Sequence, residues 1–126
     1  MDAERAPVTP RNFIRPCLLL LLREQPSHGY ELLERLRPFR IERDPGGLYR
    51  ALRALERDGF VRSAWEPSSG GPERRIYQLT RAGTEELHRA ATSLLGTRDV
   101  LQVFMSRYAE FVSLERRQPA PARDQT

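Results

Sequence analysis

Residues 44–59 read DPGGLYRALRALERDG, and this stretch has the pattern of a short helix with two different faces. Its apolar residues recur at the three- and four-residue spacing that gathers side chains on one side of a helix. They are Leu48, Ala51, Leu52 and Leu55. The opposite side carries Gly46, Arg50, Arg53 and Arg57. We therefore expect an amphipathic helix over residues 45–58 with a basic outer face.

The ends of this helix are also marked in the sequence. Asp44 can accept hydrogen bonds from the free N–H groups at the helix start, and Pro45 fits the first helical position. Gly59 can close the other end. A short helix with three guanidinium groups on one face, and no side chain at its start, suits insertion into a DNA groove. A charged face that only meets water is the alternative interpretation.

The charge distribution favours contact with nucleic acid. The chain has 126 residues and a net charge of +4, and all its cations other than histidine are arginines. Residues 35–81 hold 11 arginines and six acidic residues, whereas residues 82–126 hold six of each. The basic excess therefore surrounds the arginine-bearing helix, as expected of a surface that attracts phosphate.

The surrounding residues predict the other elements of a winged helix-turn-helix. Helices are expected over residues 16–24, with the run Leu18–Leu22 deeply buried, and over residues 28–37, with Ser27 as N-cap and Pro38 as the stop. Alternating patterns at 60–66 and 74–80, separated by a turn at 67–72, predict a β-hairpin. The expected fold is mostly α with this small hairpin. We assign residues 11–80 to the DNA-binding domain and 1–10 to a flexible arm.

A long helix is expected over residues 81–117, followed by a disordered tail at 118–126. Its apolar residues step alternately by three and four positions, with one polar break at Arg98, which is a heptad seam. The seam residues are Leu87, Ala91, Leu94, Leu101, Met105, Tyr108 and Val112, and Phe104 and Phe111 widen the apolar face. Because one small domain offers no core to cover this face, we expect a homodimer. Gly96 is expected to weaken the middle of the helix, and the sequence leaves open whether the helix kinks or splits there or is continuous.

Several motifs in this order resemble the PadR-like family of winged-helix transcriptional regulators. The matching motifs are His28-Gly29-Tyr30-Glu31-Leu32, Gly47-Leu48-Tyr49-Arg50-Ala51-Leu52, Leu55-Glu56, Gly59-Phe60-Val61, Gly71-Pro72, Arg74-Arg75, Tyr77-Gln78-Leu79-Thr80 and Gly83. The resemblance implies a dimer whose third helix enters the major groove and whose last helix dimerises. It also implies repression of efflux or detoxification genes, relieved by a small molecule near the dimer interface. Gly47 stands where the family often has Ser or Thr. The last helix lacks the Trp that some multidrug-binding members use to stack flat ligands.

The arginine-bearing helix and the hairpin supply the residues expected to contact DNA. They are Tyr30, Gly46, Gly47, Tyr49, Arg50, Arg53, Arg57, Arg74 and Arg75. Residues near the helix start should lie closest to the base edges, and Arg57 should contact phosphate. Arg74 and Arg75 follow the hairpin tip and should approach the minor groove or its phosphates. For the ring of Tyr49, a role in packing alone is the alternative.

Other side chains are expected to have structural roles. Phe104, Met105, Tyr108 and Phe111 should pack in the dimer, although Phe104, Tyr108 and Phe111 could also line a site for a small aromatic or apolar effector. Cys17 should be a small buried hydrophobe, and Trp65 should anchor the hairpin to the core. His28 should order the start of the second helix, and His88 has no companion ligands at metal spacing, so we expect no metal and no cofactor.

These patterns predict a cytoplasmic repressor that binds a pseudo-palindromic double-stranded DNA operator as a homodimer. The alternative is a winged-helix module that binds proteins without specific DNA binding. The six-residue run 17–22 is too short to span a membrane. An enzyme is not expected, because the chain shows no nucleophile triad, no cluster of metal ligands and no phosphate-binding loop.

Overall fold

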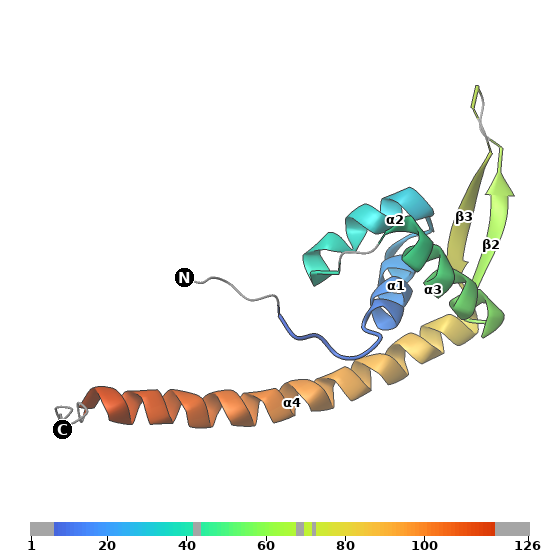
Figure 1. Ribbon diagram of the computed structural model, residues 1–126. Helices are drawn as coiled ribbons and strands as arrows, with labels where there is room; N and C mark the ends of the chain where they lie inside the picture. The colour runs from blue at the N-terminus through green and yellow to red at the C-terminus, as the bar shows by residue number, and fades with distance from the viewer. Residues whose placement is uncertain (1–6, 42–43, 68–69, 72, 118–126) are drawn as a thin grey trace. The chain divides into compact units, whose positions relative to one another are not determined.

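The computed structural model describes residues 7–41, 44–67, 70–71 and 73–117, and over these residues it is a winged helix-turn-helix with a long last helix. The elements are α1 (Ile14–Glu24), β1 (Ser27–His28), α2 (Gly29–Arg35), a 3-10 helix η1 (Arg37–Phe39), α3 (Pro45–Arg57), β2 (Val61–Glu66), β3 (Arg74–Leu79) and α4 (Arg81–Arg117). Figure 1 labels α1, α2, α3, α4, β2 and β3. The chain divides into a winged-helix unit, Met1–Ala90, and a C-terminal unit, Ala91–Thr126. This boundary lies inside α4, ten residues beyond the predicted one. The predicted tail at 118–126, and residues 1–6 of the predicted arm, lie outside the described residues.

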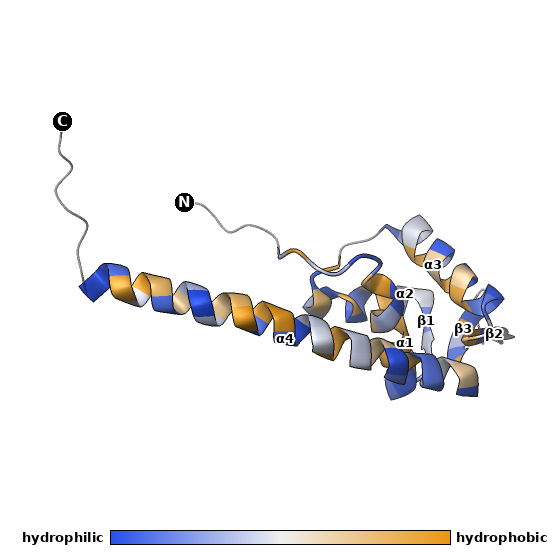
Figure 2. Cartoon of the chain, turned by 90° about the horizontal axis from the view of Figure 1, so that it is seen from below, coloured by the Kyte–Doolittle hydropathy of each residue, from blue (hydrophilic) through white to orange (hydrophobic). Residues whose placement is uncertain are grey.

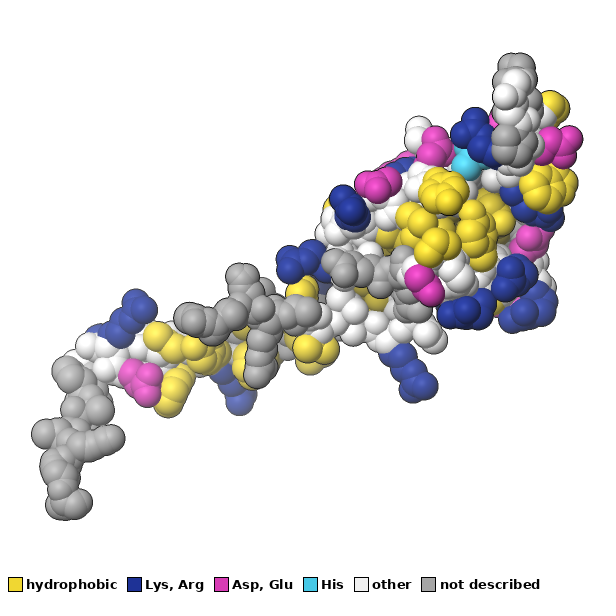
Figure 3. Space-filling model, turned by 45° about the horizontal axis from the view of Figure 1, so that its top comes forward, with side chains coloured by type: hydrophobic (Ala, Val, Ile, Leu, Met, Phe, Trp, Pro, Cys, Tyr) yellow, Lys and Arg dark blue, Asp and Glu magenta, His cyan; other side chains and the backbone are white. Residues whose placement is uncertain are grey.

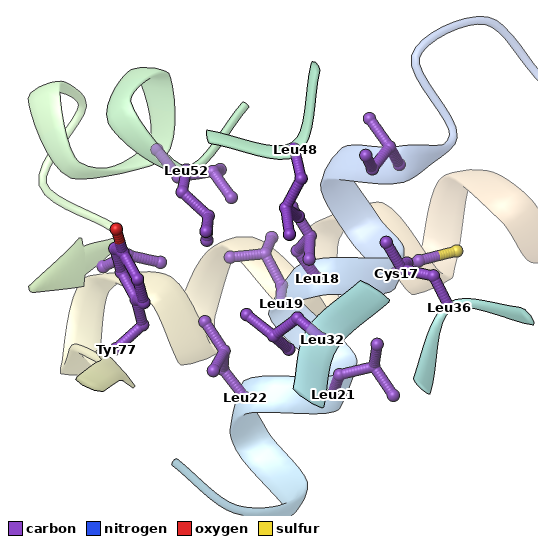
Figure 4. Packing of buried hydrophobic residues seen from close by; sticks show 13 residues of the cluster. Cys17, Leu18, Leu19, Leu21, Leu22, Leu32, Leu36, Leu48, Leu52 and Tyr77 are labelled. Atoms are coloured by element: carbon purple, nitrogen blue, oxygen red, sulfur yellow. The ribbon is translucent and has the colours of Figure 1, made fainter. Parts of the chain in front are cut away.

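The core of the winged-helix unit is a cluster of leucines from α1, α2 and α3 (Figure 4). Leu18, Leu32, Leu48, Leu52 and Leu55 are completely buried. Burying a leucine side chain stabilises a fold by roughly 1.5–3 kcal/mol, so these five account for much of the packing. The expectation that the whole run 18–22 is deeply buried holds except at Leu20, which is 37% exposed.

The second helix differs most from its sequence prediction. It ends at Arg35, and Pro38 lies inside the following 3-10 helix η1 instead of stopping α2. Its N-cap is His28, because Ser27 belongs to the short strand β1, where it pairs with Tyr77 of β3. The sheet is therefore three-stranded, antiparallel and ordered β1-β3-β2, with one more strand than predicted.

Arg35 stabilises the turn between α1 and α2. Its guanidinium donates to the buried hydroxyl of Ser27, to the Leu21 carbonyl at 2.7 Å and to a Glu24 carboxylate oxygen at 3.0 Å. One cation thus satisfies a carbonyl, a hydroxyl and a carboxylate where α1 stops. Charge-assisted hydrogen bonds of this kind are stronger than neutral ones.

The connection from α3 to the hairpin explains two of the glycines. Gly59 has a φ of +85°, the Phe60 N–H donates to the Leu55 carbonyl at 2.9 Å, and the Gly59 N–H donates to Glu56 at 3.0 Å. These two bonds form the helix ending that favours glycine. A Cβ on Gly83, in the first turn of α4, would lie 2.1 Å from the Phe60 carbonyl oxygen. Gly83 therefore allows α4 to begin directly against the base of the hairpin.

The described part of the C-terminal unit is a single helix with a broad apolar surface. The helix is continuous through Gly96, so it is not split at that position. Leu101, Phe104, Met105, Tyr108 and Phe111 are each between 51% and 63% exposed. The rings of Phe104 and Tyr108 are stacked, with centroids 6.4 Å apart. Figure 2 shows hydrophobic residues recurring along this stretch of α4.

Candidate nucleic-acid interface

The first turn of α3 brings its basic residues to the surface. Asp44 caps the helix by accepting a hydrogen bond from the Gly47 N–H at 2.9 Å, and Pro45 occupies the start. Leu48 and Leu52 are fully buried, so the opposite face must point outward. That face carries Gly46, Arg50, Arg53 and Arg57, and all four are exposed, as predicted.

The three α3 arginines have no carboxylate partner among the residues that the structure describes. A Cβ on Gly46 would lie 3.4 Å from a terminal nitrogen of Arg50, so that guanidinium reaches back over the helix start. A guanidinium can donate two parallel hydrogen bonds to a guanine edge or to a phosphate. The α3 surface therefore offers three unoccupied donor groups in a row.

Gly47 and Tyr49 face inward to different degrees. Gly47 is buried beneath the cap, and its N–H is already bonded to Asp44. Tyr49 is half-buried, and its hydroxyl lies against α2, where a Cβ on Gly29 would approach within 2.2 Å. The ring of Tyr49 thus packs α3 on α2, which agrees with the packing role considered for it.

The wing, formed by β2, β3 and their connecting turn, presents its two arginines differently. Arg74 is exposed, whereas the Arg75 guanidinium lies 5.0 Å from the centre of the Trp65 ring. The Arg75 Nε donates to the Ser63 hydroxyl at 2.9 Å, and Ser63 donates to Glu56 of α3 at 2.9 Å. This network ties the wing to α3. The wing-tip residues 68, 69 and 72 of the predicted turn lie outside the described residues.

Trp65 does not anchor the hairpin to the core as expected, because its side chain is 59% exposed. The alternation of β2 places Val61 in the core, but the hairpin extends beyond the leucine cluster before it reaches Trp65. The ring is instead covered in part by Arg75. Tyr77 of β3 is the buried aromatic residue of the wing, and its burial raises the pKa of its hydroxyl.

His28 orders the start of α2, as predicted, and also reaches the wing. Its backbone N–H donates to Glu31 at 2.8 Å, and its Nδ1 lies 3.2 Å from the same oxygen. Its Nε2 lies 2.7 Å from a Glu66 oxygen of β2. The His28 backbone hydrogen bond is the main reason that the pKa of Glu31 is lowered. Tyr30, the next outward residue of α2, is 76% exposed beside this contact.

Sequence reasoning missed the contacts that join α2, α3 and the wing. Glu66 is 38 residues from His28, and Ser63 is 12 residues from Arg75. No local spacing signals such pairs, since they depend on how the hairpin folds back. Among the described residues, no group of three or more His, Cys, Asp or Glu side chains could hold a metal ion.

Comparison with known proteins identifies the fold and the family. The model of the family described as "Transcriptional regulator PadR-like family" matches residues 18–89. The chain belongs to this PadR-like family. Its members are transcriptional regulators and not enzymes, as the motifs had suggested. The matched region covers α2, α3, the wing and the first turns of α4.

A similar protein is also named as a transcriptional regulator. The Mycobacterium tuberculosis protein named "Probable transcriptional regulator Rv1176c" is 32% identical over 80 residues, which are 57% of this chain and 40% of that protein. The match thus spans less than half the length of this relative.

Solved structures show the same fold. The crystal structure of TM0937, described as a potential transcriptional factor, is 33% identical, with a TM-score of 0.70 over 84% of this chain and 99% of that one. A PadR family regulator from Eggerthella lenta is 27% identical, with a TM-score of 0.67 over 75% and 83% of the two chains. Bacillus subtilis PadR, solved with operator DNA, is 23% identical and aligns with a TM-score of 0.59 over 66% of this chain and 48% of that one.

No described helix has the length and apolar character needed to cross a bilayer.

Proposed function

We propose that this PadR-like regulator is a repressor that binds a pseudo-palindromic operator as a homodimer, with α3 in the major groove and the wing beside it. The observation that carries the proposal is the exposed row of Arg50, Arg53 and Arg57, which has no carboxylate partner among the described residues. An arginine face that serves only solubility is commonly interleaved with acidic residues. Such a regulator acts in the cytoplasm, where its operator lies.

The expected roles follow from position on α3 and the wing. Arg50 and Gly46 lie at the N-terminal part of α3, where a recognition helix contacts base edges. Arg53 and Arg57 lie farther along, and Arg74 is on the wing, so we assign them to phosphate contacts. Tyr30 is exposed beside them, whereas Gly47, Tyr49 and Arg75 hold the surface in place through Asp44, Gly29 and Ser63. Bacillus subtilis PadR, which shares the fold, was crystallised with operator DNA.

The apolar surface of α4 supports the dimer. Phe104, Met105 and Tyr108 are each more than half exposed, and aromatic residues are enriched in the buried parts of interfaces. We also propose that a small aromatic or apolar effector binds at Phe104, Tyr108 and Phe111 between the subunits, and that it releases DNA by changing the spacing of the two α3 helices.

Fluorescence anisotropy tests DNA binding, using DNA from immediately upstream of the gene and unrelated DNA as competitor over a salt series. Arg50→Ala should weaken specific binding by roughly 1–3 kcal/mol, and Arg57→Ala should weaken binding to both DNAs and reduce the salt slope by about one. Arg107→Ala, on α4, is the charge-matched control. Equal and weak binding of all variants to both DNAs would favour the alternative, a module that binds proteins.

A further inference from the structure

A pocket of about 510 Å³ lies between the start of α2, Tyr49 of α3 and the two wing strands. Aromatic side chains dominate its lining, namely Tyr30, Tyr49, Trp65 and Tyr77. All these residues belong to the winged-helix unit. Figure 3 shows hydrophobic side chains gathered on this unit beside a histidine, with basic and acidic groups around them. The pocket lies in one unit and is separate from the Phe104–Phe111 surface of α4.

Contacts on each side hold the pocket open. Gly29 supplies no side chain to it, and the Tyr49 hydroxyl lies directly against the Gly29 backbone. The wall formed by the wing is held to α2 by the His28–Glu66 contact at 2.7 Å and to α3 through Ser63. The pocket is therefore formed by the fold itself, without a ligand. Ligand sites for small molecules are usually preformed in this way.

The lining determines which ligand fits. Tyr30 and Trp65 both line the pocket and are 76% and 59% exposed, and the Arg75 guanidinium lies 5.0 Å from the centre of the Trp65 ring. The charged residues around it, Glu31, Glu73 and Arg74, together with Arg75, balance in sign, so they select neither an anion nor a cation. The volume lies within the usual 300–1,000 Å³ of small-molecule sites. We propose that this pocket binds a flat, uncharged aromatic molecule of one or two fused rings, which packs against Tyr30 and Trp65.

Binding there would compete with DNA. Tyr30 and Arg74 line the pocket and also belong to the surface assigned to the operator. Tyr49 and Arg75, which hold that surface in place, line the pocket as well. A ligand between α2 and the wing would occupy space that the DNA backbone needs, whatever happens at the dimer interface. This consequence rests on the proposed function, whereas the existence of the binding site does not.

Trp65 allows a direct test of the site, because it is the only tryptophan in the chain. Benzimidazole is a suitable probe, since it is flat, has two fused rings and leaves tryptophan selectively excitable. Titration of the full chain should change Trp65 emission to saturation, with one site per chain. Tyr30→Ala should weaken the apparent affinity at least ten-fold. This variant should fold normally because Tyr30 is exposed, and circular dichroism checks that it does.

Val103→Ala is the control, because it removes an exposed apolar side chain of α4 that is assigned neither to the dimer nor to the effector site. Its titration should follow that of the wild type. A response that never saturates, or an affinity that falls in Val103→Ala and not in Tyr30→Ala, would overturn the site. Isothermal calorimetry of the same variants provides a readout that does not depend on fluorescence.

DNA anisotropy with and without saturating benzimidazole tests the competition. The apparent Kd for upstream DNA should rise with the probe concentration in the wild type and stay constant in Tyr30→Ala. A Trp65 emission change that saturates while the DNA affinity stays constant would overturn the proposed competition. If the chain binds no specific DNA, the proposed function fails, while the Trp65 titration still decides whether the pocket is a site.

Discussion

At the scale of single residues, Gly29 shows how a missing side chain positions a functional surface. Gly29→Ala would place a Cβ 2.2 Å from the Tyr49 hydroxyl and 2.6 Å from its ring, so the Tyr49 side chain or the two helices would have to shift. We expect a loss of about 1–3 kcal/mol in the free energy of unfolding, the usual cost of overpacking. Urea denaturation measures this loss.

Two other glycines provide matched controls for this substitution. Gly96 is exposed within α4, with nothing within 4 Å of its added Cβ, so Gly96→Ala should stabilise the helix by about 0.5–1 kcal/mol. Gly46 meets mainly the flexible end of Arg50, at 3.4 Å, and should tolerate Ala. Equal stabilities of Gly29→Ala and Gly46→Ala would show that the Gly29–Tyr49 contact does not constrain the fold.

Cys17 is a second residue whose chemistry follows from burial. It is 2% exposed in the leucine core, and burial raises the pKa of its thiol from 9.0 to about 11. Since the folded pKa lies above the unfolded one, its contribution to stability is complete below pH 9 and is lost as the pH rises toward 11. At pH 8 the native thiol should react with Ellman's reagent far more slowly than the urea-unfolded chain. Equal rates would contradict its burial.

At the scale of elements, the position of the wing depends on contacts that do not themselves touch DNA. Ser63→Ala removes the hydroxyl that joins Arg75 to Glu56, at 2.9 Å on each side, without touching an exposed cation. We expect this variant to weaken DNA binding several-fold and to leave the salt slope unchanged. Arg74→Ala, which removes an exposed cation, should lower the slope by about one. Salt-dependent anisotropy separates the two effects, and a changed slope in Ser63→Ala would contradict the positioning role.

The elements also show which features of this fold are readable from sequence. The repeating leucines and the cap residues of α3 predicted that helix within one residue, because hydrophobic period and capping are local. The strand β1 was missed because two residues are too few to show an alternating pattern. It is a strand only through its pairing with β3. Likewise, the exposed arginines of α3 could be predicted from their spacing. The exposed position of Trp65 could not, since it depends on how far the hairpin extends past the core.

At the scale of the whole molecule, the seam prediction separates into two parts. Leu87, the first seam residue, belongs to the winged-helix unit and packs against its core. Leu101, Phe104, Met105 and Tyr108 lie in the other unit and remain exposed in a single chain. The dimer contact is therefore expected from the later seam residues and from Phe104 beside them, where apolar surface is still exposed to water.

Phe104→Asp tests this expectation. The substitution places a charge in a surface that dimerisation would bury, and an unpaired buried charge is costly. We expect the dimer dissociation constant, measured by sedimentation equilibrium, to rise at least 100-fold. Ser106→Asp adds the same charge to an exposed position outside the seam and should leave the dimer intact. A dimer unchanged by Phe104→Asp would mean that the chain pairs through another surface.

The same variant connects assembly to operator binding. In the proposed dimer each winged-helix unit contacts one half-site, and two linked units gain affinity because the second contact is intramolecular. Phe104→Asp should therefore lose affinity for an operator with two half-sites while keeping its affinity for one half-site, because the α3 arginines are unaltered. An insertion of about 5 bp between the half-sites should weaken the wild type, since it turns one half-site to the opposite side of the duplex. If the wild type binds the operator with the insertion as tightly as the original operator, that result would contradict the rigid pairing of two α3 helices on one face of DNA.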